Sequence, residues 1–324
     1  MNLAVVVLTT VLGAQPVPGF LLKPQGGAIR VMTWNIYRDS VFPADGERVD
    51  ASAASRPAQF ARVLQALQPD VLCLQQVTVG AARSAALVNS ILPLPDGGSW
   101  QAHGAEDTVI VSRFRIRARS EGRVENGDRR RGHSIALIDT PAASLYVVCA
   151  HFQSGDGGED IAMRRHQAQM IVSTVRESKE GRGPIALRPR TPFIMLGDFN
   201  AINARQFVDA LEAAELVAKQ AGMRRQGLDW DRSQVTDALP RHNGEGSQRY
   251  TWRDDLDRFP PGILDRVLYS DSVLTSVNEF VLDTTSMTYE QLVKARLRLI
   301  DVMRDPQAGI HDHYPVVVDL ALRR

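Results

Sequence analysis

The chain of 324 residues carries a formal net charge of +1, and 44% of its residues are hydrophobic. This length allows one large domain or two small ones, and the hydrophobic share is ordinary for a soluble globular protein with a sizeable core. The near-neutral charge excludes a protein that coats polyanions through its overall charge. Any attraction for phosphate must therefore be local.

The N-terminal segment predicts export. Leu3 to Leu12 is almost wholly apolar, and the small residues Gly13 and Ala14 precede a segment rich in proline. This pattern resembles a signal peptide cleaved after about Ala14, although no Lys or Arg precedes the apolar run. The run is too short to span a bilayer. We assign residues 1–28 to a signal peptide and linker and expect a periplasmic or secreted protein; a mis-assigned start or a disordered tail, with a cytoplasmic protein, is the alternative.

Apolar and β-branched runs predict strands throughout the chain. They lie at 30–36, 71–77, 108–113, 134–139, 145–152, 192–198, 264–270 and 315–321. Strands interleaved with helices, without a uniform βαβ repeat, favour an α/β sandwich over a Rossmann sheet. We expect one domain over residues 29–324.

Helical patterns lie between several of these strands. A first helix can be capped by Ser55 and is stopped by Pro69, and its apolar residues from Phe60 onward recur at helical spacing. Similar apolar stripes at 163–175 and 207–214 predict two further helices. Such stripes are far more often core-facing surfaces than cofactor sites.

From about Ala221 to Pro261 the regular patterns give way to polar sequence rich in Gly and Arg. Loops of this length in compact domains are commonly functional or disordered. Within it, the segment Arg249 to Arg253 mixes cations and aromatic residues. This segment could line a substrate cleft, and a surface hairpin is an equal alternative.

The two cysteines, Cys73 and Cys149, both lie inside apolar runs. A disulfide is conceivable in an exported protein. Buried thiols, however, behave as small hydrophobic groups. We therefore expect both cysteines to be interior and unpaired.

Six short segments carry residue types that suit phosphoester cleavage. In five of them a polar residue of such a type ends or follows a short apolar run, and the other offers the amide of Gln76 where a carboxylate would be useful. The segments are 31–35, 72–77, 149–152, 195–201, 264–267 and 312–316.

Each polar residue has an ordinary alternative when taken alone. Asp198 and Asn200 can point into one site from a strand end, where a carboxylate and an amide suit Mg²⁺, water and phosphate; the same residues also make a good turn. His151 could be a purely structural histidine. Asp265, in an apolar run, needs a partner such as His313, and such a pair would fix the tautomer of the histidine. Six such segments in this order make coincidence improbable.

In this order the segments resemble the endonuclease/exonuclease/phosphatase superfamily, which includes deoxyribonuclease I, bacterial sphingomyelinases and inositol polyphosphate 5-phosphatases. Gly-Asp-Phe-Asn and Asp-His-x-Pro are its most specific motifs here, and the resemblance runs from about Ile29 to Leu322. It implies a four-layer αββα sandwich, in which two packed and mostly antiparallel sheets are flanked by helices. It places the site at one end of the sheets.

The resemblance also implies catalytic roles by position. Asp198 would position or activate the attacking water, and Asn200 would contact the phosphate. His313 would act on the phosphate as an acid or base, oriented by Asp265. His151 would bind phosphate or serve the leaving group.

For the metal, the resemblance implies Mg²⁺ or Mn²⁺ near Asn35, Gln76, Asp198 and Asp312. Glu106 would orient the imidazole of His151. The family has a metal-binding glutamate at position 76, where this chain has glutamine. The amide keeps one oxygen of similar reach but loses a full negative charge.

Two functions follow as alternatives. The first is a metal-dependent phosphoester hydrolase with weakened metal binding, acting on nucleic acid, a phospholipid head group or a small phosphoester. The second is a catalytically impaired protein with the same fold that binds phosphorylated ligands or other proteins. We expect no transmembrane segment in the mature chain, and the sequence indicates no stable protein partner.

Overall fold

A computed structural model describes residues 17–126, 129–201 and 227–323. The predicted signal peptide, apart from the linker that follows it, and the helix predicted at 207–214 lie outside these residues. Among the described residues, no helix has the length and apolar character needed to cross a membrane.

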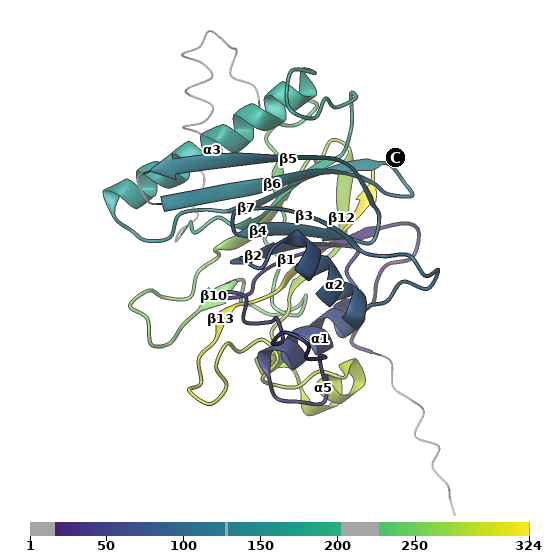
Figure 1. The fold of residues 1–324 in the computed structure, drawn as a ribbon, viewed down its shortest axis with the longest axis vertical. Coiled ribbons are helices and arrows are strands. Elements are labelled where there is room, and N and C mark those ends of the chain that lie inside the picture. Colours follow the sequence, from purple (N-terminus) through teal and green to yellow (C-terminus); the bar gives the residue numbers. More distant parts are fainter. Residues whose placement is uncertain (1–16, 127–128, 202–226, 324) are drawn as a thin grey trace, which may run out of the picture.

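Two six-stranded sheets form the centre of the described chain (Figure 1). In the first sheet β1 and β2 run parallel, and the other neighbours run antiparallel. Its strand order is β12 (Leu274–Val281), β14 (Val316–Leu322), β1 (Ile29–Asn35), β2 (Val71–Gln75), β4 (Thr108–Ser112) and β3 (Gln101–Ala105).

In the second sheet only β7 and β8 are parallel. Its order is β5 (Arg115–Asn126), β6 (Arg129–Asp139), β7 (Ser144–His151), β8 (Phe193–Asp198), β11 (Asp265–Tyr269) and β9 (Thr236–Asp237). A small separate ladder joins β10 (Trp252–Arg253) to β13 (Asp312–His313).

Helices cover the outer faces of both sheets, which completes the predicted four-layer αββα sandwich (Figure 1). The long helix α3 (Gly158–Lys179) lies beside the second sheet, whereas α1 (Arg56–Leu67), α2 (Ala81–Ile91) and α5 (Tyr289–Ala295) lie on the side of the first. Two short 3-10 helices, η1 (Gly19–Leu21) and η2 (Thr284–Ser286), complete the elements described. Ser55 occupies the N-cap of α1, but its side chain makes no capping hydrogen bond.

The alternation of side chains along β7 explains how the layers hold together. Val147 and Cys149 join the core between the sheets, whereas Tyr146 and Val148 join a second core under α3. Both faces are thus buried, which is why β7 is a nearly continuous apolar run. As predicted, Cys149 and its counterpart Cys73 on β2 are buried, free thiols.

All eight predicted strands are present. The largest difference in their bounds is at β6, which begins at Arg129, five residues earlier than predicted. Three longer strands, β3, β5 and β12, were not predicted. The described part of the 221–261 segment contributes β9 and β10.

Candidate active site

Strand register places three of the predicted residues side by side. On β7, β8 and β11, His151 pairs with Asp198, and Asp198 pairs with Asp265. Asp312 and His313 come from β13, whose partner strand β10 contributes Trp252 opposite His313. Contacts of Asp198 with His151 and His313, and of His313 with Asp265, bring the ends of these strands together.

The Gly-Asp-Phe-Asn segment needs its glycine for close packing. Gly197 has a φ of +145°, and a Cβ there would lie 1.9 Å from the carbonyl oxygen of Ala150 on β7. Beyond it, Asn200 takes a left-handed φ of 47°, and its backbone N–H donates to Asp198 Oδ1 at 2.9 Å. Its side-chain Nδ2 donates to the Phe152 carbonyl at 3.0 Å. The motif is therefore both a turn and the support of the Asp198 carboxylate.

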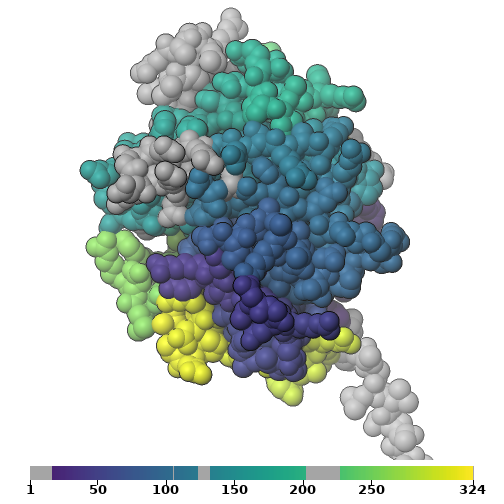
Figure 2. Space-filling model, viewed as in Figure 1, coloured from purple at the N-terminus to yellow at the C-terminus, as the bar shows by residue number. Residues whose placement is uncertain are grey.

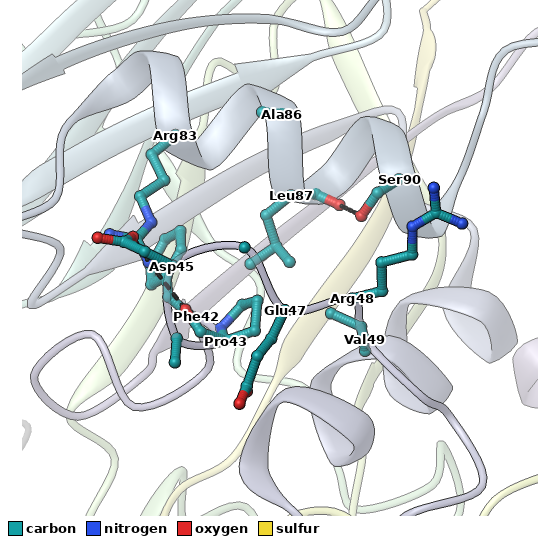
Figure 3. A pocket seen from close by; sticks show the side chains of 12 residues that line it. Phe42, Pro43, Asp45, Glu47, Arg48, Val49, Arg83, Ala86, Leu87 and Ser90 are labelled. Atoms are coloured by element: carbon teal, nitrogen blue, oxygen red, sulfur yellow. Dashed lines mark hydrogen bonds and ion pairs between the residues drawn. The ribbon is translucent and has the colours of Figure 1, made fainter.

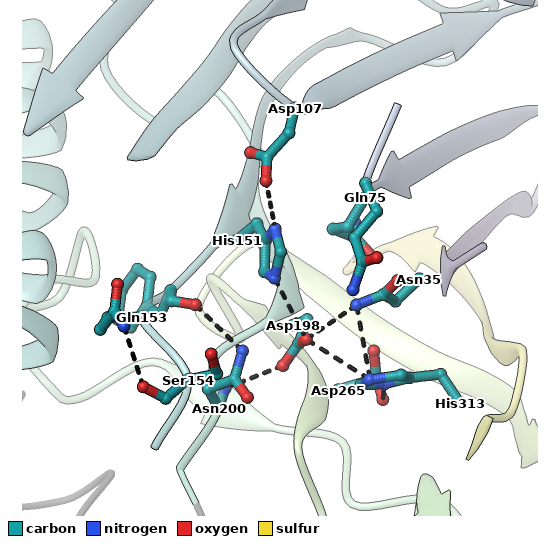
Figure 4. Close-up of polar contacts among 12 residues, drawn as sticks. Asn35, Gln75, Asp107, His151, Gln153, Ser154, Asp198, Asn200, Asp265 and His313 are labelled. Carbon is teal, nitrogen blue, oxygen red and sulfur yellow. Dashed lines mark hydrogen bonds and ion pairs between the residues drawn. The ribbon is translucent and has the colours of Figure 1, made fainter. Parts of the chain in front are cut away.

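Asp198 is the centre of the polar cluster (Figure 4). Its Oδ2 accepts a hydrogen bond from Asn35 Nδ2 at 3.0 Å and lies 3.6 Å from Nε2 of both His151 and His313. The side chain of Asp198 is 1% exposed. A buried carboxylate of this kind requires partners, and here an amide and two imidazoles surround one oxygen.

His313 and Asp265 form the predicted hydrogen-bonded pair, with 2.7 Å between Nδ1 and Oδ2. Burial lowers the pKa of His313, but the carboxylates of Asp265, Asp198 and Asp312 outweigh burial, and the pKa is raised above its ordinary value. Burial raises the pKa of Asp265, while His313 lowers it. We place the proton on His313, because two carboxylates face its ring and only the cation attracts both. Within the described residues Asp198, Asp265 and His313 also offer atoms within 4.8 Å of one another, which is close enough to hold a metal ion.

His151 has an acidic partner, but it is Asp107 and not the predicted Glu106. Asp107 Oδ2 lies 2.6 Å from His151 Nδ1 (Figure 4). Glu106 takes a left-handed φ of 53° in the turn between β3 and β4, and its side chain lies against Gly132 of β6. Adjacent residues at such a turn point in different directions, so the prediction was wrong by one position.

A cavity of about 240 Å³ opens over this cluster. Six of the eight predicted site residues line it: Gln76, His151, Asp198, Asn200, Asp312 and His313. Asn35 and Asp265 do not line it but contact Asp198 and His313 from behind. Sequence reasoning missed the aromatic walls Tyr37 and Phe259, whereas Trp252 lies in the segment suggested as a cleft lining.

At the other end of the cavity, Gln76 holds an unusual turn in place. Gln76 has a φ of 61°, and its side-chain Oε1 accepts a hydrogen bond from the backbone N–H of Arg38 at 3.1 Å. Tyr37, Arg38 and Asp39 are all left-handed, with φ of 57°, 51° and 57°. Each such residue costs roughly 1–2 kcal/mol. Bonds from Asp39 N–H to the Gln76 carbonyl and from Tyr37 N–H to Asn35 Oδ1 offset this cost.

Asp312 is the carboxylate at this end. Its Oδ1 accepts a hydrogen bond from Trp252 Nε1 at 3.1 Å, and its Oδ2 lies 3.8 Å from Nη1 of Arg304. A hard cation here would find one carboxylate beside a guanidinium and one amide oxygen that already accepts a hydrogen bond. Lone pairs remain on both groups, so this donor set fits a divalent cation that keeps several waters and binds weakly.

A larger cavity of about 570 Å³ lies elsewhere, between the 42–49 segment and α2 (Figure 3). Its charged lining includes Arg83, which pairs with Asp45 at 3.0 Å. None of the predicted site residues lines it. The polar cluster around Asp198 is therefore the better candidate for chemistry.

The sequence profile of the Endonuclease/Exonuclease/phosphatase family matches residues 32–286. The chain belongs to this family. The match covers four of the six segments singled out above and all but the first residue of a fifth, and it ends before Asp312 and His313. No curated protein matches the chain by sequence.

Several solved structures share this fold. The human Nocturnin catalytic domain with bound sulfate is 17% identical, with a TM-score of 0.53 over 95% of this chain and 100% of that one. Truncated Caenorhabditis elegans TDP2 is 16% identical, with a TM-score of 0.56 over 90% and 97%. D. rerio TDP2 complexed with a single-strand DNA product is 14% identical, with a TM-score of 0.54 over 91% and 100%. At these identities the likeness concerns the fold.

Proposed function

We propose that this protein hydrolyses phosphoesters and uses a weakly bound divalent cation, Mg²⁺ or Mn²⁺. One observation carries the proposal: the buried Asp198 carboxylate lies 3.6 Å from the Nε2 atoms of two imidazoles, each of which has its own carboxylate partner. Members of this family generally hydrolyse phosphoesters. A chain without catalytic demand need not keep such a costly buried cluster.

The geometry supports separate roles for the two sides of the cluster. Asp198 can accept a proton from, or orient, a water molecule in the cavity. His313, cationic beside Asp265, can neutralise charge on a phosphate oxygen or donate a proton to it. His151, oriented by Asp107, faces the same carboxylate and can serve the leaving group. Asn200 lines the cavity and retains an amide hydrogen for a phosphate oxygen.

Asp312 and Gln76 would hold the cation, with Asp198 and Asn35 beside it. When bound, the cation supplies positive charge to the phosphate group. This arrangement provides one fewer negative charge than a site with glutamate at position 76. We therefore propose that half-saturation with Mg²⁺ requires a high concentration.

A binding protein without turnover is the second candidate. The neutral Gln76 favours it, because its Oε1 is already engaged by the Arg38 N–H. Such a protein would bind phosphorylated ligands in the same cavity. Fold and polar contacts are shared by both candidates, so hydrolysis itself must distinguish them.

The experiment is a hydrolysis panel at high Mg²⁺ and Mn²⁺ concentrations. The substrates are a generic diester, a generic monoester, DNA, RNA and sphingomyelin, which cover the three open substrate classes. We expect turnover of at least one, abolished by Asp198→Asn. Binding of a phosphorylated compound with no turnover of any substrate would favour the second candidate.

We also propose that the protein is exported to the periplasm or the medium. The support is the apolar run from Leu3 to Leu12 followed by small residues. Expression of the full chain, followed by fractionation and N-terminal sequencing, tests this. A mature protein that begins near Gln15 in the exported fraction is expected, whereas an intact N-terminus in the cytoplasm would contradict it.

A further inference from the structure

We propose that Arg304 is a phosphate-binding residue of this site, and that through it the site binds the phosphate group of its substrate without a divalent cation. The inference rests on the proposed function, because it concerns the same cavity. It departs from that proposal in one respect. The charge that first captures the phosphate belongs to the chain itself.

Arg304 lies at the rim of the cavity. Its guanidinium carbon is 4.5 Å from the centroid of the Tyr37 ring. Its Nη1 is 3.8 Å from Asp312 Oδ2, and its Nη2 is 3.6 Å from Asp254 Oδ2. Tyr37 and Asp312 both line the cavity, and the Arg304 side chain is 23% exposed. The yellow segment that contains Arg304 and the light-green segment near residue 250 lie at the same end of the molecule (Figure 2).

The N–H donors of the Arg304 guanidinium make no hydrogen bonds within the described chain. Both ion-pair distances exceed a hydrogen bond, and within the described chain the Arg304 side chain donates to no acceptor. By contrast, the guanidinium of Arg30 donates to both oxygens of Asp319 and to three backbone carbonyls, including that of Leu21. A guanidinium has five N–H donors in a planar fork that matches two phosphate oxygens. Arg304 is therefore held near the cavity while its N–H groups have no hydrogen-bond acceptor in the described chain.

The turn under Arg304 explains why it stays in place. The ring of Tyr37 supports the guanidinium, and the left-handed turn that orients this ring is held by the hydrogen bond from Arg38 N–H to Gln76 Oε1. With its oxygen so engaged, the amide of Gln76 has its Nε2 donors left, and this residue lines the cavity. Gln76 thus offers a hydrogen-bond donor to the cavity at whose rim Arg304 lies. A donor and a cation together suit an anion.

Two carboxylates face the Arg304 guanidinium, but neither accepts a hydrogen bond from it, because Asp254 Oδ2 lies 3.6 Å and Asp312 Oδ2 lies 3.8 Å away. The N–H donors of the guanidinium therefore remain available to phosphate oxygens. The Nε2 atom of His313 lies 4.0 Å from Asp312 Oδ1, so its imidazole faces the same region. Phosphate would lie between the imidazole and the guanidinium.

Calorimetry with inorganic phosphate in the presence of EDTA tests the proposal on the full mature chain. The wild type is expected to bind phosphate without added metal. Arg304→Gln is expected to weaken the affinity roughly ten- to a hundredfold, the range for a hydrogen bond to a charged group. Arg304→Lys keeps the charge but loses the planar fork, so its affinity is expected to fall between the two.

Arg83→Gln is the matched control, because Arg83 also lies over an aromatic ring, that of Phe42, and pairs with an aspartate, but it lines the other cavity. Its phosphate affinity is expected to equal that of the wild type. Circular dichroism checks folding of every variant. If Arg304→Gln fails to fold, Arg304→Lys decides, and an affinity within twofold of the wild type overturns the proposal.

Absence of phosphate binding by the wild type in EDTA also overturns it. The hydrolysis panel at high Mg²⁺ separates this failure from that of the proposed function. Turnover with Mg²⁺ but no phosphate binding in EDTA would support the proposed hydrolase function and contradict the proposed role of Arg304. Phosphate binding that depends on Arg304, with no turnover of any substrate, would support this inference and contradict the hydrolase.

Discussion

The two ends of the cavity differ in how their charges are paired. At one end, Asp198, His313 and Asp265 are almost fully buried and joined by short contacts, with 2.7 Å between His313 Nδ1 and Asp265 Oδ2. At the other, Gln76 is neutral, and Asp312 lies 3.8 Å from Arg304. At the first end each charged group lies close to a partner of opposite charge. At the second end the group at position 76 carries no charge, and the ion pair of Asp312 with Arg304 exceeds hydrogen-bond distance.

In the proposed function, proton transfer depends on the imidazole end and cation affinity depends on the Gln76 end. We therefore expect variants at the two ends to change different measurable quantities. Catalytic rate and pH dependence should respond at the first end, and metal or phosphate affinity at the second.

The largest effect is expected for Asp198→Asn, which removes the carboxylate at the imidazole end and preserves its shape. The value of kcat/KM should fall by roughly a hundredfold to ten-thousandfold, the usual contribution of a positioned acid or base. Steady-state assays on the best substrate of the panel measure it. Asp139→Asn, in a partly exposed ion pair with Arg117 on the same sheet, is the control and should be neutral. A loss under tenfold for Asp198→Asn would remove Asp198 from the chemistry.

Next in size is the effect of Asp265→Asn on His313. Removing the adjacent carboxylate should lower the pKa of His313 by roughly one to three units, because an opposite charge at this distance favours the cation. The raised pKa in the wild type keeps His313 cationic at neutral pH, and activity that needs this cation is lost as the pH rises through that pKa. In Asp265→Asn the loss should occur at lower pH.

NMR titration of the His313 ring measures this shift directly. His242, whose ring is hydrogen-bonded to Asp283 outside the site, provides an internal reference in the same spectra. Identical titration of His313 in the wild type and in Asp265→Asn would show that the pair does not set its charge.

The smallest expected effect on kcat/KM distinguishes the roles of two adjacent acidic residues, Asp107 and Glu106. Asp107→Asn should lower kcat/KM about tenfold, which corresponds to about 1.4 kcal/mol from the lost charge-assisted bond to His151. Glu106→Gln is the matched control, because its side chain lies against Gly132. It should change kcat/KM less than twofold. The reverse order would mean that Glu106, as first predicted from the sequence, orients His151.

The sequence predicted the central strands because their residues are buried on both faces and form apolar runs. The strands that it missed have other patterns. β5 alternates arginine with small or apolar residues at the edge of its sheet, and β12 has an irregular register between Ser276 and Asn278. Helix α2 was also missed, because it has few large apolar residues besides Leu87, Val88 and Ile91.

The predicted site residues came together because strand ends in a sandwich meet at one end. What the sequence could not provide is the direction of side chains in turns and loops. The choice between Glu106 and Asp107 depends on one left-handed residue. Arg304 comes from a loop without a motif, and only the fold places it over Tyr37. Neither side-chain position can be predicted from a periodic pattern in the sequence.

Titration of Mg²⁺ by calorimetry into the wild type and Gln76→Glu tests the difference between the two ends most directly. One oxygen of the new carboxylate can keep the bond to the Arg38 N–H, and the other can meet the cation. If the added contact contributes ~2–3 kcal/mol, which lies within the range for hydrogen bonds to charged groups, Mg²⁺ affinity should rise roughly thirty- to a hundred-and-fifty-fold. Activity at limiting Mg²⁺ should rise with it. Equal Mg²⁺ affinity in the two proteins would contradict the assignment of Gln76 to the cation end of the site.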